Sequence, residues 1–184
     1  MILYSKGHNL KTFLLVLLFT FSPLFATNLV ITHANVQAHT EVFGDSAINP
    51  TTTSLTSHLT MGKNIESIRG KIDISMLDLK SDKADRDKNM AESIESAKYT
   101  LATYTFKEVK KSTEGYTVNG VLNFHGVKKP LVIHAEIQKI KGGITFKGTS
   151  SFLMSNYNVV PPKMLFLTVR DQIDLMIDVK FKKR

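Results

Sequence analysis

The stretch YTVNGVLNFHGVKKPLVIHAEI, at residues 116–137, alternates apolar and polar side chains on both sides of a short break. Successive side chains of a β-strand point to opposite faces of the sheet, so this pattern predicts two strands that each bury one face. The break, at residues 125–130, contains Gly126 and Pro130, and proline cannot donate a hydrogen bond to a central ladder. We therefore predict two neighbouring strands separated by a turn over residues 125–130.

The same period of two recurs on either side of this pair, and it dominates the chain from residue 35 onward. The clearest run begins at Ile173, a shorter one at Ile72 and a weaker one at Ile144. Lys141-Gly142-Gly143 stands at hairpin spacing between two strands. Strand signals return about every 10 to 15 residues, which is typical of an antiparallel sandwich or barrel and not of alternating β-α units. The sequence therefore predicts an all-β fold.

One segment departs from the alternation. Residues 82–97, DKADRDKNMAESIESA, are rich in helix formers, and Met90 and Ile94 stand four residues apart in a narrow apolar stripe. Asp82 is suited to the N-cap position, where a carboxylate accepts hydrogen bonds from the first free backbone N–H groups. We predict one short helix between the third and fourth strands, covering one end of a barrel.

The N-terminus has the pattern of a secretory signal. Lys6 and Lys11 precede an apolar run at residues 13–25, whose 13 residues are fewer than the roughly 20 needed to span a bilayer as a helix. We predict a signal peptide at residues 1–26, cleaved after Ala26, and a single domain at residues 27–184. The alternative is an uncleaved amphipathic anchor.

Charge and cysteine usage narrow the class of protein further. The 184 residues carry a formal charge of +8, which falls to +6 when residues 1–26 are removed, because two lysines and no acid are lost. The absence of cysteine excludes a disulfide framework, cysteine-ligated zinc and a thiol nucleophile, and it suits a bacterial periplasm, where disulfides are permitted but not required. We predict a periplasmic or secreted protein with no stable membrane span after signal removal.

The basic residues are scattered except at the C-terminus, where Lys180, Lys182, Lys183 and Arg184 cluster. We interpret this cluster as a solvated tail and not as a recognition patch. No basic stretch interleaved with aromatic residues and no known reading motif is present, so we expect no nucleic-acid partner.

Motifs that carry catalysis are absent from the sequence. It contains no G-x-S-x-G elbow, phosphate loop, G-x-G-x-x-G or H-E-x-x-H, and no two histidines have the spacing of a metal-binding helix. We therefore expect neither an enzyme nor a metal site. An eight-stranded barrel can hold one elongated small ligand or fill its interior with its own side chains, and periodicity alone leaves both possibilities open.

Three stretches resemble the YceI family of bacterial periplasmic lipid-binding barrels. Residues 86–90, RDKNM, are similar to its R-D-x-x-M segment, and Lys98-Tyr99 follow as in K-Y-P-x-I-x-F. Residues 116–130 resemble Y-x-V-x-G-x-L-x-(I/F)-(H/R)-G-V-x-K-x, and residues 157–162 and 169–171 resemble the short-form ending. The chain departs from the family at Thr100, where proline is usual, and at residues 152–157, which replace R-x-D-F-G.

This resemblance implies an extended, antiparallel, eight-stranded lipocalin-like β-barrel with one short helix near one end. It also implies a polyisoprenoid, an isoprenoid quinone or a similar amphiphile in the pore. The predicted function is that of a non-enzymatic periplasmic carrier, with the lipid as its partner and no cofactor. The alternative is a filled-core stress-response or protein-interaction module that acts through its outer surface. A homodimer is left open.

Strand parity, with Tyr104 matched to the family's strand phenylalanine, selects the residues that we predict to line the pore. They are Tyr104, Phe106, Val118, Leu122, Phe124, Ile133, Ile137, Ile144, Phe146 and Phe152. Arg86 and Asp87 are candidates for contact with a polar headgroup at the pore mouth. The preferred interpretation of these two residues is structural, as a buried ion pair or cap that fixes the helix to the barrel rim.

Overall fold

The computed structural model describes residues 26–42, 46–164 and 167–184. The predicted signal at residues 1–26 lies outside the described residues, apart from Ala26. Everything said below about packing and contacts concerns the described part of the chain.

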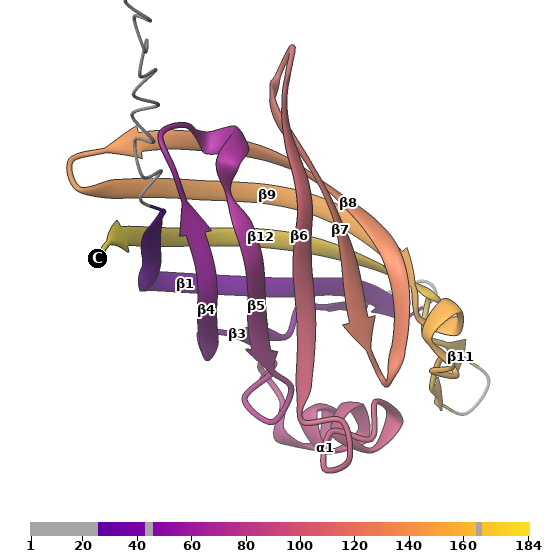
Figure 1. The fold of residues 1–184 in the computed structure, drawn as a ribbon. Helices are drawn as coiled ribbons and strands as arrows, with labels where there is room; N and C mark the ends of the chain where they lie inside the picture. Colours follow the sequence, from indigo (N-terminus) through magenta and orange to yellow (C-terminus); the bar gives the residue numbers. More distant parts are fainter. Residues whose placement is uncertain (1–25, 43–45, 165–166) are drawn as a thin grey trace, which may run out of the picture.

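Eight long antiparallel strands form a closed barrel (Figure 1). They are β1 (Thr27–Val42), β4 (Leu55–Met61), β5 (Arg69–Ser75), β6 (Leu101–Ser112), β7 (Gly115–Phe124), β8 (Val127–Ile140), β9 (Gly143–Leu153) and β12 (Gln172–Lys183). Around the barrel the order is β12-β9-β8-β7-β6-β5-β4-β1, and pairing of β1 with β12 closes the ring. The prediction of an all-β, eight-stranded, lipocalin-like barrel with one short helix is confirmed.

Several short elements join these strands. They are β2 (Ser46–Ile48), β3 (Thr51–Thr52), η1 (Ile65–Ser67), η2 (Met154–Tyr157), β10 (Lys163–Met164) and β11 (Leu167–Thr168). The strands β2 and β3 both pair with β1, and β10 pairs with β11 in a small separate hairpin. None of these was predicted, because two to four residues are too few to show a period.

The helix α1 (Ala84–Ser93) lies between β5 and β6, the third and fourth long strands, at one end of the barrel (Figure 1). Its position is as predicted, but its N-cap is Lys83 and no side chain caps the first turn. The prediction of Asp82 as N-cap is therefore wrong: its carboxylate instead pairs with Arg86, with 2.8 Å between Asp82 Oδ1 and Arg86 Nη1.

The turn between β7 and β8 is shorter than predicted. It consists of His125 and Gly126, whose φ angles of 50° and 75° are those of a two-residue type I′ hairpin turn. Pro130 therefore lies inside β8, opposite Val121 of β7. A proline is tolerated there because β9 pairs with β8 only from His134 onward, so the neighbouring ladder has no use for an N–H at this position.

The C-terminal basic cluster is also not a tail. Lys182 pairs with Gly143 of β9, and Lys183 pairs with Leu29 of β1, so β12 continues as a strand to Lys183. Alternation of Val179 and Phe181, which are buried, with the lysines places the cations on the outer face.

The barrel interior is filled at the end opposite α1, which we call the closed end. Strand direction places at this end the last residues of β4, β6 and β8 and the first residues of β1, β7 and β9. The short helix η1 also lies there. Buried side chains from these segments pack there, namely Leu29, Leu59, Met61, Ile65, Ile68, Val109, Val118, Ile137 and Ile144. The end next to α1, which we call the mouth, is not filled in this way.

Candidate functional site: an apolar cavity in the barrel

A cavity of about 1130 Å³ occupies the barrel between the closed end and α1. All eight long strands contribute to its wall, which is built mainly from aliphatic and aromatic side chains. Pockets that hold small ligands usually measure about 300–1,000 Å³. The barrel is therefore not completely filled, and beside its packed closed end it offers room for one large apolar molecule.

Seven of the ten residues predicted to line the pore belong to the cavity wall. They are Tyr104, Phe106, Leu122, Phe124, Ile133, Phe146 and Phe152. The other three, Val118, Ile137 and Ile144, point into the barrel as predicted but lie in the filled closed end and are not part of the wall. Parity identifies the face of a strand and not the depth of a residue along the barrel, which is why these three were included. Contact of the seven with a ligand stays a prediction.

Much of the cavity wall was not named as a site from the sequence. It comes from β1, β5 and β12, and includes Val36, Ala38, Ile72, Ile74, Leu175, Ile177, Val179 and Phe181. The runs in β5 and β12 show the same alternation as the strands that were chosen. The signal was thus present, and closure of the barrel through β1 and β12 is what makes these residues face the others.

Three aromatic rings of the cavity wall, from Tyr104, Phe106 and Phe146, pack against one another. The Tyr104 ring packs edge-on against Phe106, with 5.2 Å between ring centroids, and Phe106 packs against Phe146 at 6.3 Å. The Tyr104 hydroxyl donates toward the backbone carbonyl oxygens of Val118 and Leu131, each 3.0 Å away. Burial raises the pKa of Tyr104 well above its ordinary value, so the hydroxyl remains a donor across the physiological range.

The path of the Tyr104 ring explains the glycine in the middle of β7. An added Cβ at Gly120 would lie 2.3 Å from Tyr104 Cζ and 2.6 Å from the Thr105 carbonyl oxygen. Gly120 therefore serves the close approach of a side chain, and the space above it belongs to Tyr104.

The mouth is framed by polar and charged residues of α1 and of β10. Lys83, Asp85, Arg86 and Glu92 lie along the opening from the helix side, and Lys163 lies there from β10. Cations and acids are both present at this opening, so a headgroup at the mouth would meet both signs of charge.

Arg86 and Asp87 do not pair with each other. Arg86 belongs to the mouth and is held by Asp82, whereas Asp87 lies outside the cavity wall. The Asp87 carboxylate accepts a 2.7 Å hydrogen bond from the Ser81 backbone N–H. Desolvation acts to raise the pKa of Asp87, but the hydrogen bonds from Ser81 outweigh it and the pKa lies below its ordinary value. Asp87 thus fastens the loop that precedes the helix.

His125 connects the end of α1 to the barrel. Its Nε2 lies 2.7 Å from Glu95 Oε2, its Nδ1 lies 3.0 Å from the Tyr157 carbonyl oxygen, and the Tyr99 ring packs 4.4 Å away. The hydrogen bond from His125 lowers the pKa of Glu95. This contact joins the segment after α1, the β7–β8 turn and η2, and so fixes the helix over the mouth.

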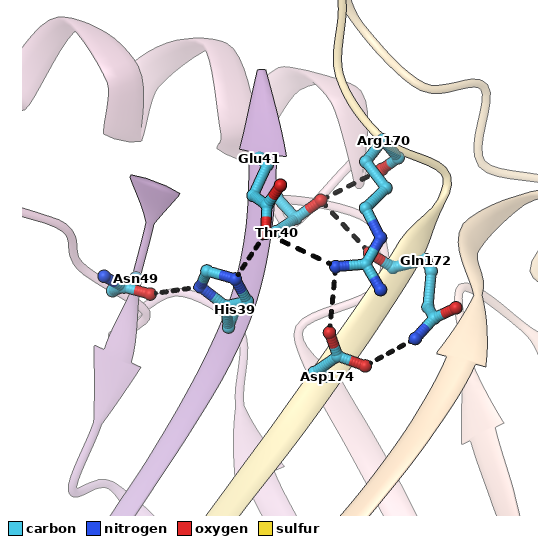
Figure 2. Close-up of polar contacts among 7 residues, drawn as sticks. All are labelled: His39, Thr40, Glu41, Asn49, Arg170, Gln172 and Asp174. Atoms are coloured by element: carbon cyan, nitrogen blue, oxygen red, sulfur yellow. Dashed lines mark hydrogen bonds and ion pairs between the residues drawn. The ribbon is translucent and has the colours of Figure 1, made fainter. Parts of the chain in front are cut away.

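A second polar group, the rim cluster, joins the ends of β1 and β12 beside the mouth (Figure 2). It consists of His39, Thr40, Glu41, Asn49, Arg170, Gln172 and Asp174. Thr40, buried and part of the cavity wall, donates to the carbonyl oxygens of Arg170 and Gln172, and Arg170 pairs with Asp174 at 3.0 Å. His39 lies between Asn49 Oδ1 at 2.6 Å and Glu41 Oε1 at 3.2 Å, so both ring nitrogens face acceptors. The cluster holds the β2–β3 segment, through Asn49, onto the rim.

The rim cluster predicts a pH-dependent contribution of His39 to stability. Hydrogen bonds to Asn49 and then to Glu41 raise the pKa of His39 above its ordinary value. A group with a raised folded pKa stabilises the fold below its unfolded pKa, and that stabilisation is lost as the pH rises through the folded pKa. We expect His39→Gln to destabilise the protein at pH 5 and to have a much smaller effect at pH 9, measured by urea unfolding. The exposed His33→Gln serves as control, and an equal loss at both pH values for His39→Gln would contradict the assignment.

Neither a metal cluster nor a membrane-spanning helix is found in the described ranges. No three His, Asp or Glu side chains within residues 26–42, 46–164 and 167–184 gather as a metal ion would require. No helix in the same ranges has the length and hydropathy to cross a bilayer. The prediction that no metal or cofactor takes part stays a prediction.

Curated proteins similar to this chain are bacterial and match it over part of its length. A UPF0312 protein of Yersinia enterocolitica is 35% identical over 77 residues, which are 41% of this chain and 40% of that protein. A UPF0312 protein of Shewanella baltica is 33% identical over 97 residues, which are 48% and 51% of the two chains. The matches thus span about half or less of these relatives.

Solved structures share the fold at low sequence identity. Burkholderia cenocepacia BcnA superposes with a TM-score of 0.71 at 13% identity, over 80% of this chain and 95% of BcnA. A polyisoprenoid-binding domain of Saccharophagus degradans gives a TM-score of 0.64 at 13% identity, over 86% and 99% of the two chains.

Family membership is decided by a longer match that runs through the whole barrel. The family model described as the YceI-like domain matches residues 28–181, from the second residue of β1 to the third residue from the end of β12. This range contains every strand that lines the cavity, and the chain therefore belongs to the YceI family.

Proposed function

We propose that this protein holds one long apolar lipid, such as a polyisoprenoid or an isoprenoid quinone, in the barrel cavity and carries it through the periplasm. The observation that carries the proposal is the cavity of about 1130 Å³ with its aliphatic and aromatic wall. Each CH₂ group removed from water is stabilised by roughly 0.8 kcal/mol, so a long hydrocarbon chain gains many kcal/mol by entering. An isoprenoid tail is nearly insoluble for the same reason and needs such a sheath to cross water.

Similarity to known proteins supports the same ligand class. The chain belongs to the YceI family, and a structural neighbour with the same fold is a polyisoprenoid-binding domain. We propose that the seven predicted wall residues contact the lipid tail, with Leu122, Phe146 and Phe152 among them. The proposed role involves binding and release only, so it needs no catalytic group and no cofactor beyond the cargo.

The proposed location follows from the N-terminal sequence. We propose that residues 1–26 direct export and are removed after Ala26, so that the barrel acts outside the cytoplasm.

The alternative function assumed a barrel whose interior is completely filled. Side chains fill only the closed end of the barrel, so we favour the lipid carrier over this alternative.

Extraction of the purified protein tests the proposal directly. The protein would be exported by a Gram-negative host, purified without detergent, extracted with organic solvent and examined by mass spectrometry. We expect one class of isoprenoid lipid at close to one molecule per chain. Repeated extracts with no lipid, together with no binding of an added fluorescent polyprenyl compound, would reject the carrier function.

A further inference from the structure

The net positive charge of this protein is concentrated on its closed end. Its charged residues include the acids Glu66, Glu108 and Glu114 and the cations Arg69, Lys110 and Lys111. Six further cations lie there on adjoining segments, so cations outnumber acids, and they are Lys63, Lys139, Lys141, Lys182, Lys183 and Arg184. All six are exposed, and none of them takes part in an ion pair within the described residues. Figure 1 shows the β8–β9 turn and the C-terminus on the same side of the barrel, away from α1. We call these six residues the basic end.

One side-chain and two backbone hydrogen bonds hold the basic end together. Lys139 Nζ lies 3.4 Å from the Lys63 carbonyl oxygen, which joins the end of β8 to the segment before η1. The Lys183 N–H donates to the Gly142 carbonyl at 2.8 Å, and the Arg184 N–H donates to the Asn28 carbonyl at 2.9 Å. The cations are therefore displayed by a fixed scaffold of strands.

Apolar side chains stand among these cations. Ile140, which is 45% exposed, lies between Lys139 and Lys141 at the tip of the β8–β9 hairpin. Val30, which is 38% exposed, pairs with Lys182 across the β1–β12 ladder. Exposed aliphatic residues flanked by lysines are typical of surfaces that rest in the headgroup region of a bilayer.

The upstream sequence reaches the barrel at the same place. Strand β1 begins at Thr27, opposite Met61, and thus at the closed end. The apolar run of residues 13–25 precedes it directly in the sequence. During the proposed export, before residues 1–26 are removed, the upstream chain therefore joins the barrel at the basic end.

The charges at the mouth lack this bias. Lys83, Arg86 and Lys163 there are accompanied by Asp85 and Glu92, and Arg86 is already paired with Asp82. An anionic surface therefore attracts the closed end more strongly than the mouth, and this orients the molecule.

We propose that the basic end is a docking surface for an anionic phospholipid bilayer, on which the barrel rests with its mouth facing away. A bilayer suits the patch better than a nucleic acid, because the exposed apolar side chains among the cations are aliphatic and offer no ring for base stacking. The proposal does not depend on the lipid cargo, since docking and the cavity use opposite ends of the barrel.

Vesicle co-sedimentation tests the docking surface with the exported, purified protein. The vesicles would be phosphatidylcholine alone or phosphatidylcholine with about one third phosphatidylglycerol, at low salt, where each nearby lysine contributes most. We expect binding to the anionic vesicles only, weakened strongly by high salt. The triple variant Lys139→Glu, Lys141→Glu, Lys182→Glu should bind about a hundredfold more weakly or worse.

A matched variant separates position from total charge. Lys80→Glu, Lys88→Glu, Lys128→Glu changes the same charge at exposed positions near α1 and should bind within about threefold of the parent, because those lysines face away from the bilayer. Thermal unfolding checks that both triple variants are folded. Equal losses in the two variants, equal binding to neutral vesicles, or capture of an acidic protein without any vesicle binding would each overturn the proposal.

Discussion

Ala102→Phe is expected to prevent lipid uptake while leaving the barrel folded. Ala102 is buried on β6 and belongs to the cavity wall, one inward position nearer the mouth than Tyr104. A phenyl ring there occupies space that the tail would otherwise fill. If it displaces three CH₂ groups, binding loses about 2.4 kcal/mol, or roughly fiftyfold in affinity. The ring has no polar atom to leave unsatisfied, and filling an apolar void maintains or raises stability.

The measurement combines lipid content, affinity and thermal unfolding. Extracts of Ala102→Phe should contain little isoprenoid, and titration with a fluorescent polyprenyl compound should show the weaker binding. Val132→Phe enlarges a side chain on the outer face of β8, where Val132 is 42% exposed, and should bind like the parent. Full lipid occupancy of a folded Ala102→Phe protein would show that the cavity is not the binding site.

Gly120→Ala is expected to destabilise the fold severely. Its Cβ would overlap the Tyr104 ring at 2.3 Å and the Thr105 carbonyl oxygen at 2.6 Å. The ring is confined by Phe106 and by its hydroxyl's hydrogen bonds, and the carbonyl belongs to the neighbouring strand, so neither can move cheaply. Overpacking of this kind costs about 3 kcal/mol. In a domain of this size that lowers Tm by about 6 to 12 °C.

Gly142→Ala provides the comparison for this substitution. Gly142 has a φ of +75°, but an added Cβ there meets no atom within 4 Å. We expect a cost of only about 1 kcal/mol, from backbone strain alone. Both variants would be measured by differential scanning calorimetry, and a Gly120→Ala protein no less stable than Gly142→Ala would refute the close packing of Tyr104 over β7.

The strand pattern was readable from the sequence where one face is uniformly apolar. In β7 and β8 the buried positions alternate without interruption from Val118 to Phe124 and from Leu131 to Ile137, and both strands were predicted. Strand β4 was missed because Leu55–Met61 carries threonine, serine and histidine at most positions, and its burial is correspondingly uneven. The turn over residues 125–130 was predicted too long for a different reason. Pro130 is tolerated within β8 because β9 does not pair with β8 at that position, and the sequence does not show where this pairing stops.

The site was predictable as a face and not as a volume. Alternation showed that Val118, Leu122 and Ile144 point inward, but only the three-dimensional packing places Leu122 in the cavity wall and leaves Val118 and Ile144 in the filled closed end. The rim cluster lay beyond sequence reasoning altogether. Thr40 bonds to Arg170, 130 residues away, and neither residue belongs to a recognisable motif.

The packed closed end leaves the cavity with its opening at the mouth, beside α1. A long hydrocarbon tail can enter such a cavity only with its apolar end first and must leave by the same route. The atoms that enter last are therefore the first to leave. The depth of the cavity then limits the length of tail that can be bound. The part of a tail that exceeds this depth stays outside the cavity, beside the helix. If the barrel carries a lipid, as we propose, it therefore selects that lipid by length as well as by chemistry, and the acceptor of the lipid has to meet it at the mouth.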